Sequence, residues 1–164
     1  MTLADIAEEA GVTAGLLVQR FGSKRDLLLA LSERFSGRTA EMFMGLRAQH
    51  RSALAALRAY SDGMAHLAAT PAALARNFAY LQIDFTDPDF RKHLSTQAVA
   101  TCDELQKLIR EVMDAGDLVD TTNPRQLART IEAVVSGSMM SWAFYQEGTA
   151  AKWMRQDLDA VLRP

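Results

Sequence analysis

The sequence predicts an all-α protein, and three observations support this fold class. No segment shows the alternation of apolar and polar residues, rich in β-branched side chains, that is typical of a strand. Only nine glycines and four prolines occur in 164 residues, and many of them stand where a helix would begin or end. Long segments repeat apolar residues three and four positions apart, which is the spacing of one helix face.

The residues that begin and end helices place each element in order. The expected helices cover residues 2–10, 13–21, 24–46, 52–69, 71–84, 88–115, 124–147 and 150–162. Thr2, Thr13 and Ser23 each stand before one of the first three helices and can accept a hydrogen bond from its first turn. Gly11 and Gly22 then end the first two helices, because glycine tolerates the left-handed conformation common at that position.

Later helices have stronger start signals. Thr70-Pro71, Asp87-Pro88 and Asn123-Pro124 each combine a capping residue with a proline whose missing N–H does no harm in the first turn. The helix that follows Asp87 repeats mostly apolar residues along one face, which predicts packing against a core. This stripe consists of Phe90, Leu94, Ala98, Thr101, Leu105, Leu108 and Val112.

Composition excludes several classes of protein. No apolar stretch approaches the roughly 20 residues of a membrane helix, and acidic residues interrupt the first ten positions, where a secretory signal needs an apolar run. We therefore expect a cytoplasmic protein with no membrane partner. The single Cys102 excludes an internal disulfide. The 18 basic and 20 acidic residues do not indicate a nucleic-acid binder, so a DNA site must come from a local motif.

The sequence contains no motif typical of an enzyme or a metal site. The phosphate-binding, zinc-protease and serine-hydrolase patterns are all absent. His50, His66 and His93 lie far apart in the chain, and one cysteine with three scattered histidines cannot form a structural zinc site. We expect no enzyme activity, no cofactor and no bound metal.

Residues 2–35 carry the strongest functional signal. Two short helices joined by a turn at Gly11 have the spacing of a helix-turn-helix, and the small Ala7 and Ala10 allow the helices to cross closely. Its small core is expected to contain Ile6, Val12, Leu17 and Phe21. The second helix would present its outward side chains to the major groove of DNA. These side chains are Thr13, Ala14, Leu16, Val18, Gln19 and Arg20.

At these residues the chain resembles the TetR family of bacterial transcriptional repressors. The run IAEEAGVTAGLLVQRFGSKRDLL follows that family's pattern of Ile-Ala, Ala-Gly-Val-Ser/Thr, a recognition helix ending in Phe, and Ser-Lys before a long helix. The resemblance implies a helix-turn-helix DNA-binding module at residues 1–36, then a helical ligand-binding and dimerisation domain at residues 37–164. It also implies that Lys24 contacts a DNA phosphate, and that Thr13 and Gln19 contribute to base readout.

Two positions depart from the family pattern. Val18 replaces a tyrosine whose hydroxyl usually reaches a phosphate, and Leu16 replaces a common serine or threonine. Apolar side chains cannot hydrogen-bond phosphate or base edges, although they can touch thymine methyl groups. Residues 1–35 also contain four basic against five acidic residues. The alternative interpretation is therefore a small-molecule-binding helical dimer whose helix-turn-helix no longer binds DNA.

The resemblance further implies one more helix before the helix-turn-helix. Leu27, Leu28, Leu29, Ala30 and Leu31 place apolar groups all round the start of the long helix, and such a helix must be covered on every side. We expect an additional N-terminal helix to cover part of this surface.

A small-molecule pocket among the middle helices is also implied by the resemblance. Aromatic, flexible apolar and neutral polar side chains suit a largely apolar ligand, although each of them alone is more often part of a core. The candidate lining residues are Tyr60, Met64, Phe78, Gln82, Phe85, Gln97, Thr101 and Trp142.

Two apolar faces on the helix over 124–147 predict a homodimer. One face can fill the core while the other meets a second copy, together with the last helix, in a four-helix interface. The alternative is that both faces are buried within one chain. Candidate interface residues are Ala133, Gly137, Met140, Phe144, Trp153 and Leu158. The sequence thus predicts a repressor that binds operator DNA as a homodimer and is released by a small-molecule effector.

Overall fold

The computed structural model confirms the all-α fold class. It describes residues 2–119 and 123–162, except for the side chains of Tyr80 and Asp84, and these residues form helices joined by turns. The α-helices are α1 (Leu3–Glu9), α2 (Ala14–Phe21), α3 (Lys24–Ser36), α4 (Thr39–Gln49), α5 (Ala53–Met64), α6 (Pro71–Thr86), α7 (Pro88–Asp114), α8 (Pro124–Tyr145) and α9 (Ala150–Val161). A 3-10 helix, η1 (Ala65–Ala68), follows α5.

One predicted helix is divided in two. The prediction of a continuous helix over 24–46 is wrong, because α3 ends at Ser36 and α4 begins only at Thr39. Glycine is a weak helix former, and Gly37 stands at this break. After the break, Thr39 and Phe43 are buried, so the new direction of the chain places one face of α4 against the core. Burial of that face therefore outweighs continuation of the helix.

The predicted helix starts are confirmed by their hydrogen bonds. Thr70, Asp87 and Asn123 each accept a bond from a backbone N–H of the first turn, at 2.9 to 3.1 Å. Thr2 forms a complete capping box with Asp5. These starts depend on residues within three positions of one another, which explains why the sequence could identify them.

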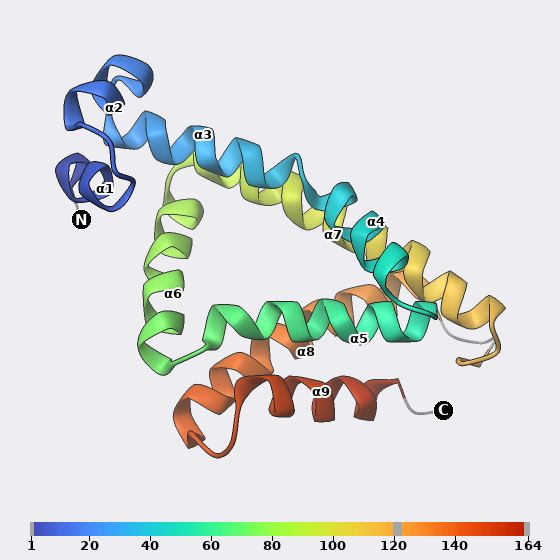
Figure 1. Cartoon of the computed structure of the whole chain (residues 1–164). Coiled ribbons are helices and arrows are strands. Elements are labelled where there is room, and N and C mark those ends of the chain that lie inside the picture. Colours follow the sequence, from blue (N-terminus) through green and yellow to red (C-terminus); the bar gives the residue numbers. More distant parts are fainter. Residues whose placement is uncertain (1, 120–122, 163–164) are drawn as a thin grey trace.

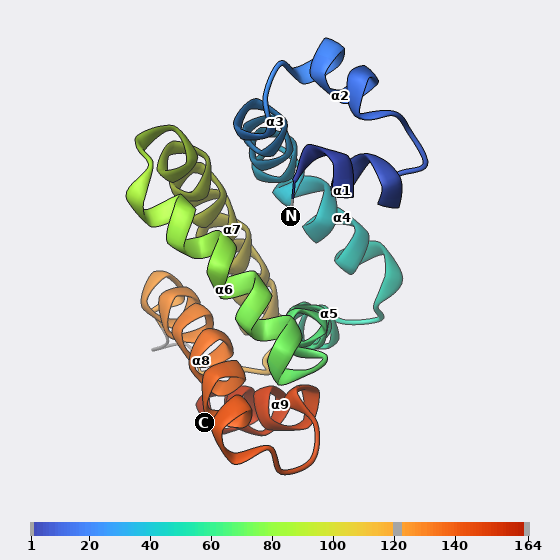
Figure 2. The same ribbon diagram turned by 90° about the vertical axis from the view of Figure 1, so that its left-hand side faces the viewer.

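The helices form two parts that share one long helix. Figure 1 shows α1 and α2 at one end of the molecule, and α5, α8 and α9 gathered at the other. The helix α7 lies alongside α3 and α4 and also packs against α5 and α8. The view in Figure 2 shows α1 to α3 well away from α8 and α9. The two ends are therefore connected through α7.

Each part has its own hydrophobic core. The smaller core contains Ala7, Leu17 and Leu27, with Ile6 and Phe21 half-buried against it. The larger core lies among α4, α5, α7, α8 and α9. Its fully buried side chains are Phe43, Leu57, Leu105, Leu108, Ile109, Val112, Ile131, Met154 and Leu158.

One residue of the predicted small core lies elsewhere. Val12 was expected inside the helix-turn-helix, but its side chain is 37% exposed, so that prediction is wrong. Leu27 from the start of α3 fills the core in its place. The third helix thus completes a core that the sequence assigned to the first two.

Ion pairs around the buried Glu104 attach α4 to α7. Arg47 Nη1 lies 2.9 Å from Glu104 Oε2, its Nε lies 2.8 Å from Glu111 Oε1, and Lys107 binds the second oxygen of Glu104. Burial by itself would raise the pKa of Glu104, but the hydrogen bonds from Lys107 and Arg47 lower it below its ordinary value. The carboxylate therefore stays ionised and holds the two helices in register.

Replacing Leu108 by alanine should strongly destabilise the larger core. The side chain is fully buried on α7, and a Leu→Ala change at such a site costs about 2–5 kcal/mol in the free energy of unfolding. Val99 on the same helix is 62% exposed, so Val99→Ala should change stability by less than about 0.5 kcal/mol. Urea denaturation of both variants provides the measurement, and equal losses would contradict this account of the core.

Candidate functional site

The helix α2 presents one face outward at the end of the molecule. Leu17 is buried on its inner side, while Leu16 and Val18 are 48% and 50% exposed. Gln19 and Arg20 are exposed beside them. The guanidinium of Arg20 lies 5.6 Å from the ring centroid of Phe21, which orients it along the helix. Gln19 and Arg20 thus carry the polar contacts that this outward face offers.

Thr13 has a structural task at this face. Its Oγ1 accepts a hydrogen bond of 3.2 Å from the backbone N–H of Leu16, which caps α2. The hydroxyl hydrogen remains able to donate, because a threonine hydroxyl both accepts and donates. Ala14, the next residue, is half-buried against the small core rather than fully outward. Of the predicted contacts on α2, Ala14 is therefore the least accessible.

The structure adds Gly15 to the outward face. It is exposed, and a side-chain carbon built at this position would meet only Thr13 Oγ1, at 4.0 Å. A glycine at this position leaves the helix backbone open to a close approach. A helical projection of α2 places Gly15 between Val18 and Gln19, so the spacing alone assigns this glycine to the outward face.

Lys24 lies at the start of α3, next to this face. It is the first residue of the helix and is exposed, directly after the capping Ser23. The N-terminus of a helix carries a partial positive charge, which favours an anion near this lysine. Gly22, with φ of +80°, makes the sharp turn that brings the end of α2 and the start of α3 together. Lys24 and Gln19 therefore lie at the same end of the molecule.

Arg25 forms ion pairs with the start of α7. Its Nη2 lies 2.8 Å from Asp87 Oδ2 and 2.7 Å from Asp89 Oδ2, at the start of α7. The hydrogen bond from Arg25 lowers the pKa of the Asp87 carboxyl. The sequence counted Arg25 among the positive charges of the DNA-binding segment, but the structure pairs it with two aspartates. The net charge available to DNA is thus less positive than the count of basic residues suggests.

The predicted effector residues are divided between the core and the surface. Tyr60 and Trp142 are buried in the larger core, where Tyr60 stacks on Phe43 with ring centroids 5.3 Å apart. Met64 and Thr101 are half-buried. Phe78, Gln82, Phe85 and Gln97 are exposed. The structure does not bring these eight residues together, and neither of the two cavities found among the described residues is lined by any of them.

Three of the exposed members share one stripe of α6, whereas Gln97 lies on α7. Leu74 begins this stripe and is buried, whereas Phe78, Gln82 and Phe85 continue it toward the end of the helix and are exposed. The spacing of three and four residues keeps all of them on one face. The helix α6 packs on η1 and α7, so its first turns are covered while the same face emerges later.

The predicted dimer residues on α8 form one exposed face. Ala133, Gly137 and Met140 are exposed, and Phe144 is 79% exposed. The opposite face of α8, with Ile131, Val135 and Met139, is buried in the core. Tyr145, near the end of α8, is exposed and stacks on Trp153 with ring centroids 5.4 Å apart.

The two predicted interface residues on α9 behave differently. Trp153 is half-buried, and its Nε1–H donates a hydrogen bond of 2.7 Å to the carbonyl oxygen of Glu147. Leu158 is fully buried within the larger core of a single chain. A side chain without accessible surface cannot contact a second copy in this arrangement, so Leu158 belongs to the core rather than to an interface.

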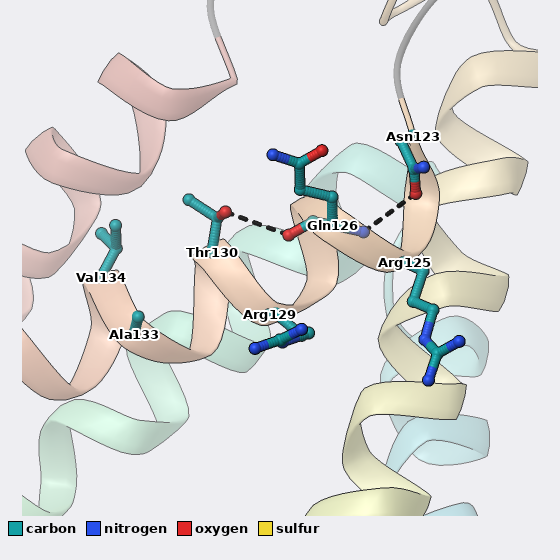
Figure 3. A pocket seen from close by; sticks show the side chains of 7 residues that line it. All are labelled: Asn123, Arg125, Gln126, Arg129, Thr130, Ala133 and Val134. Atoms are coloured by element: carbon teal, nitrogen blue, oxygen red, sulfur yellow. Dashed lines mark hydrogen bonds between the residues drawn. The ribbon is translucent and has the colours of Figure 1, made fainter.

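A cavity of about 970 Å³ lies along the first half of α8, close to the exposed face of that helix. Figure 3 shows Gln126 and Thr130 on one side of the helix and Arg125 and Arg129 on another. Ala133 and Val134 also line this cavity.

A second cavity, of about 630 Å³, lies between the two parts of the molecule. Its walls are mostly apolar and come from α1, α2, α3, α6 and α7. Leu31 and Phe35 of α3 and Ile83 of α6 line this groove and are partly exposed. The expectation that a further helix covers the start of α3 stays a prediction.

The described residues show no other functional constellation. No group of three or more histidine, cysteine, aspartate or glutamate side chains among them could hold a metal ion. Within the same part of the chain, no helix is long and apolar enough to cross a membrane.

Comparisons with known proteins agree with this arrangement. Residues 1–31 match the family described as bacterial regulatory proteins of the tetR family, and residues 53–158 match the tetracyclin repressor-like C-terminal domain. No curated protein sequence matches the chain.

Solved structures share the fold at low sequence identity. A TetR transcription regulator from Haloarcula marismortui is 16% identical with a TM-score of 0.75, over 98% of this chain and 85% of that one. FadR from Bacillus subtilis, in complex with stearoyl-CoA, is 18% identical with a TM-score of 0.73, over 99% and 87%. FadR from Thermus thermophilus, in complex with lauroyl-CoA, is 21% identical with a TM-score of 0.61, over 99% and 83%.

Proposed function

Because this chain belongs to the TetR family of bacterial regulatory proteins, we propose that it is a ligand-responsive transcriptional repressor. It acts in the cytoplasm, binds operator DNA as a homodimer, and leaves the DNA when a small, largely apolar effector binds. The observation that carries this proposal is the exposed face of α2 at one end of the molecule, with Lys24 beside it at the start of α3.

The contacts with DNA divide into two kinds. Lys24 and Arg20 contact phosphates, which fixes the position of the module but reads no sequence. Gln19 and Thr13 read base edges in the major groove, and glutamine pairs best with adenine. Leu16 and Val18 touch thymine methyl groups, and Ala14 borders the site. Gly15 allows the backbone of α2 to approach the DNA closely.

The exposed face of α8 supports the proposal of a homodimer. Ala133 and Gly137 are small and allow two helices to approach closely, while Met140 and Phe144 supply apolar area. A large exposed apolar patch is typical of an interaction site in a protein of this size. The half-buried Trp153 of α9 extends this surface. Two copies of α2 then read two half-sites of one operator.

The effector site is proposed along the exposed stripe of α6. Phe78, Gln82 and Phe85 supply an apolar surface with one neutral hydrogen-bonding group. Two of the structurally similar regulators are complexes with long-chain acyl-CoA, so lauroyl-CoA and stearoyl-CoA are the first probes to use. An effector that prefers one of two arrangements of α6 shifts the population of the DNA-binding state.

The second candidate is a small-molecule-binding dimer whose helix-turn-helix does not bind DNA. The exposed Leu16 and Val18 favour it, because these side chains offer no hydrogen bond where a DNA reader commonly has one. The pairing of Arg25 with Asp87 and Asp89 favours it further, because it removes one positive charge from the module.

Binding to duplex DNA from upstream of the gene distinguishes the two candidates. We expect the wild-type affinity to fall steeply with salt, and Lys24→Ala to reduce the slope of log K against log salt by about one, because one phosphate contact is lost. Gln19→Ala should cost about 1–3 kcal/mol and relax the sequence preference.

Arg110→Ala is the matched control for charge. Arg110 is exposed on α7, in the half of the helix that packs in the larger core, so its loss should leave the slope unchanged. A shallow slope with no sequence preference in the wild type would favour the second candidate.

The effector should weaken this DNA complex. We expect saturating lauroyl-CoA or stearoyl-CoA to lower the affinity for DNA by about 5- to 150-fold, the usual range of such coupling. Phe85→Ala should weaken binding of the acyl-CoA about tenfold, as measured by calorimetry. Val99→Ala removes an equally exposed apolar side chain from α7 and should not change it. Equal effects of the two variants would place the effector elsewhere.

A charge in the face of α8 should separate the dimer. A side-chain carbon built at Gly137 meets nothing within 4 Å, so Gly137→Glu leaves the single chain undisturbed while placing a carboxylate in the interface. Gly63 on α5 is equally open, which makes Gly63→Glu a matched control. Sedimentation velocity should show a monomer for Gly137→Glu and a dimer for Gly63→Glu. A stable dimer in both variants would assign the interface to another surface.

A further inference from the structure

Arg25 makes an unusually complete set of contacts for an exposed side chain. Its Nη2 lies 2.9 Å from Asp87 Oδ1 and 2.7 Å from Asp89 Oδ2, and its Nε lies 3.2 Å from Asp87 Oδ2. The guanidinium also lies 5.6 Å from the ring centroid of Phe90. A planar guanidinium held by two carboxylates and one aromatic ring has a fixed direction. Arg25 is therefore held against α7.

The acceptor of this contact is the corner between two helices. Asp87 ends α6 and caps α7, where its Oδ1 accepts a hydrogen bond of 2.9 Å from the backbone N–H of Asp89. The same carboxylate that starts α7 thus also binds Arg25. We refer to Arg25, Asp87, Asp89 and Phe90 as the corner clamp.

The donor of this contact lies at the start of α3, directly after the recognition helix α2. Arg25 is the second residue of α3, next to Lys24, and only Gly22 and Ser23 separate α3 from α2. The residues joined by the clamp are 62 and 64 positions apart in the chain. A contact at the first turn of α3 controls the tilt of α2 more directly than a contact further along α3.

We infer that Arg25 is a positioning residue, which fixes the angle of the helix-turn-helix on the effector domain through the corner clamp and does not contact DNA phosphate. This inference rests on the proposed DNA-binding function. It assigns a role to a basic residue that charge alone would place in the DNA interface. It also gives the α6–α7 corner a direct mechanical link to the recognition helix α2.

Variants that remove either the charge of Arg25 or the charges of Asp87 and Asp89 distinguish a positioning role of Arg25 from a contact with DNA phosphate. If Arg25 positions α2, both Arg25→Gln and the double variant Asp87→Asn with Asp89→Asn weaken binding to the upstream duplex about tenfold at an unchanged salt slope. Asparagine remains a good N-cap, so the double variant keeps the start of α7. If Arg25 contacts phosphate, the double variant frees it, and binding becomes tighter while the slope steepens.

Arg38 and Glu41 supply a matched ion pair. They lie 3.1 Å apart at the start of α4, where Arg38 is the residue before the helix, and both side chains are more exposed than Arg25. Arg38→Gln and Glu41→Gln change the same charges without touching the corner. We expect the affinity of each for DNA to stay within about twofold of the wild type. A tenfold loss in these controls would show that charge alone explains the Arg25 result.

Amide hydrogen exchange tests the clamp without DNA. Arg25→Gln and the double aspartate variant should accelerate exchange in residues 14–27 as well as at the α6–α7 corner, whereas Arg38→Gln should not. Unchanged exchange in residues 14–27 overturns the inference. A wild-type protein that binds no duplex specifically overturns the proposed function, and the exchange experiment then still decides whether Arg25 positions the module.

Discussion

The 27-residue helix α7 is stable only if its apolar stripe is covered, and different elements cover different parts of it. Leu105, Leu108 and Val112 are fully buried among α4, α5 and α8, while Phe90 is buried near α3 at the other end. Between them, Leu94 and Thr101 are half-buried and Ala98 is exposed. Because α3 covers one end of this helix and the larger core covers the other, α7 connects the helix-turn-helix to the helical C-terminal part of the chain.

Charged contacts fix the orientation of neighbouring helices, because apolar packing alone does not specify one direction. Arg47 joins α4 to α7 through Glu104 and Glu111, and Arg25 joins α3 to the start of α7. Exposed ion pairs contribute little to stability, because water screens them and long side chains lose freedom. Their directional hydrogen bonds nevertheless select one arrangement among several that bury similar apolar area. Stability therefore comes from the two cores, whereas Arg47 fixes α4 against α7 and Arg25 makes the contact that we propose sets the angle of the helix-turn-helix.

The proposed functional residues differ in how well the sequence alone could place them. The outward face of α2 could be read from the sequence, because a short amphipathic helix with one buried leucine has one way to pack. The effector residues could not, since an apolar side chain at helical spacing suits a core and a pocket equally well. Tyr60 and Trp142 are in the core, and Phe85 is on the surface. Whether an apolar side chain of α6 is accessible depends on where along its length the helix stops packing against other elements.

The sequence by itself determined the helix starts, the all-α class and the helix-turn-helix, because each depends on residues within a few positions of one another. Tertiary structure alone decided the break after Ser36, the burial of Leu158 and the exposure of Val12. It also paired Arg25 with Asp87, across 62 residues of chain. Capping and periodicity are local properties, whereas burial and charge pairing depend on which distant segments meet. Those distant segments meet only when α7 brings the two parts of the molecule together.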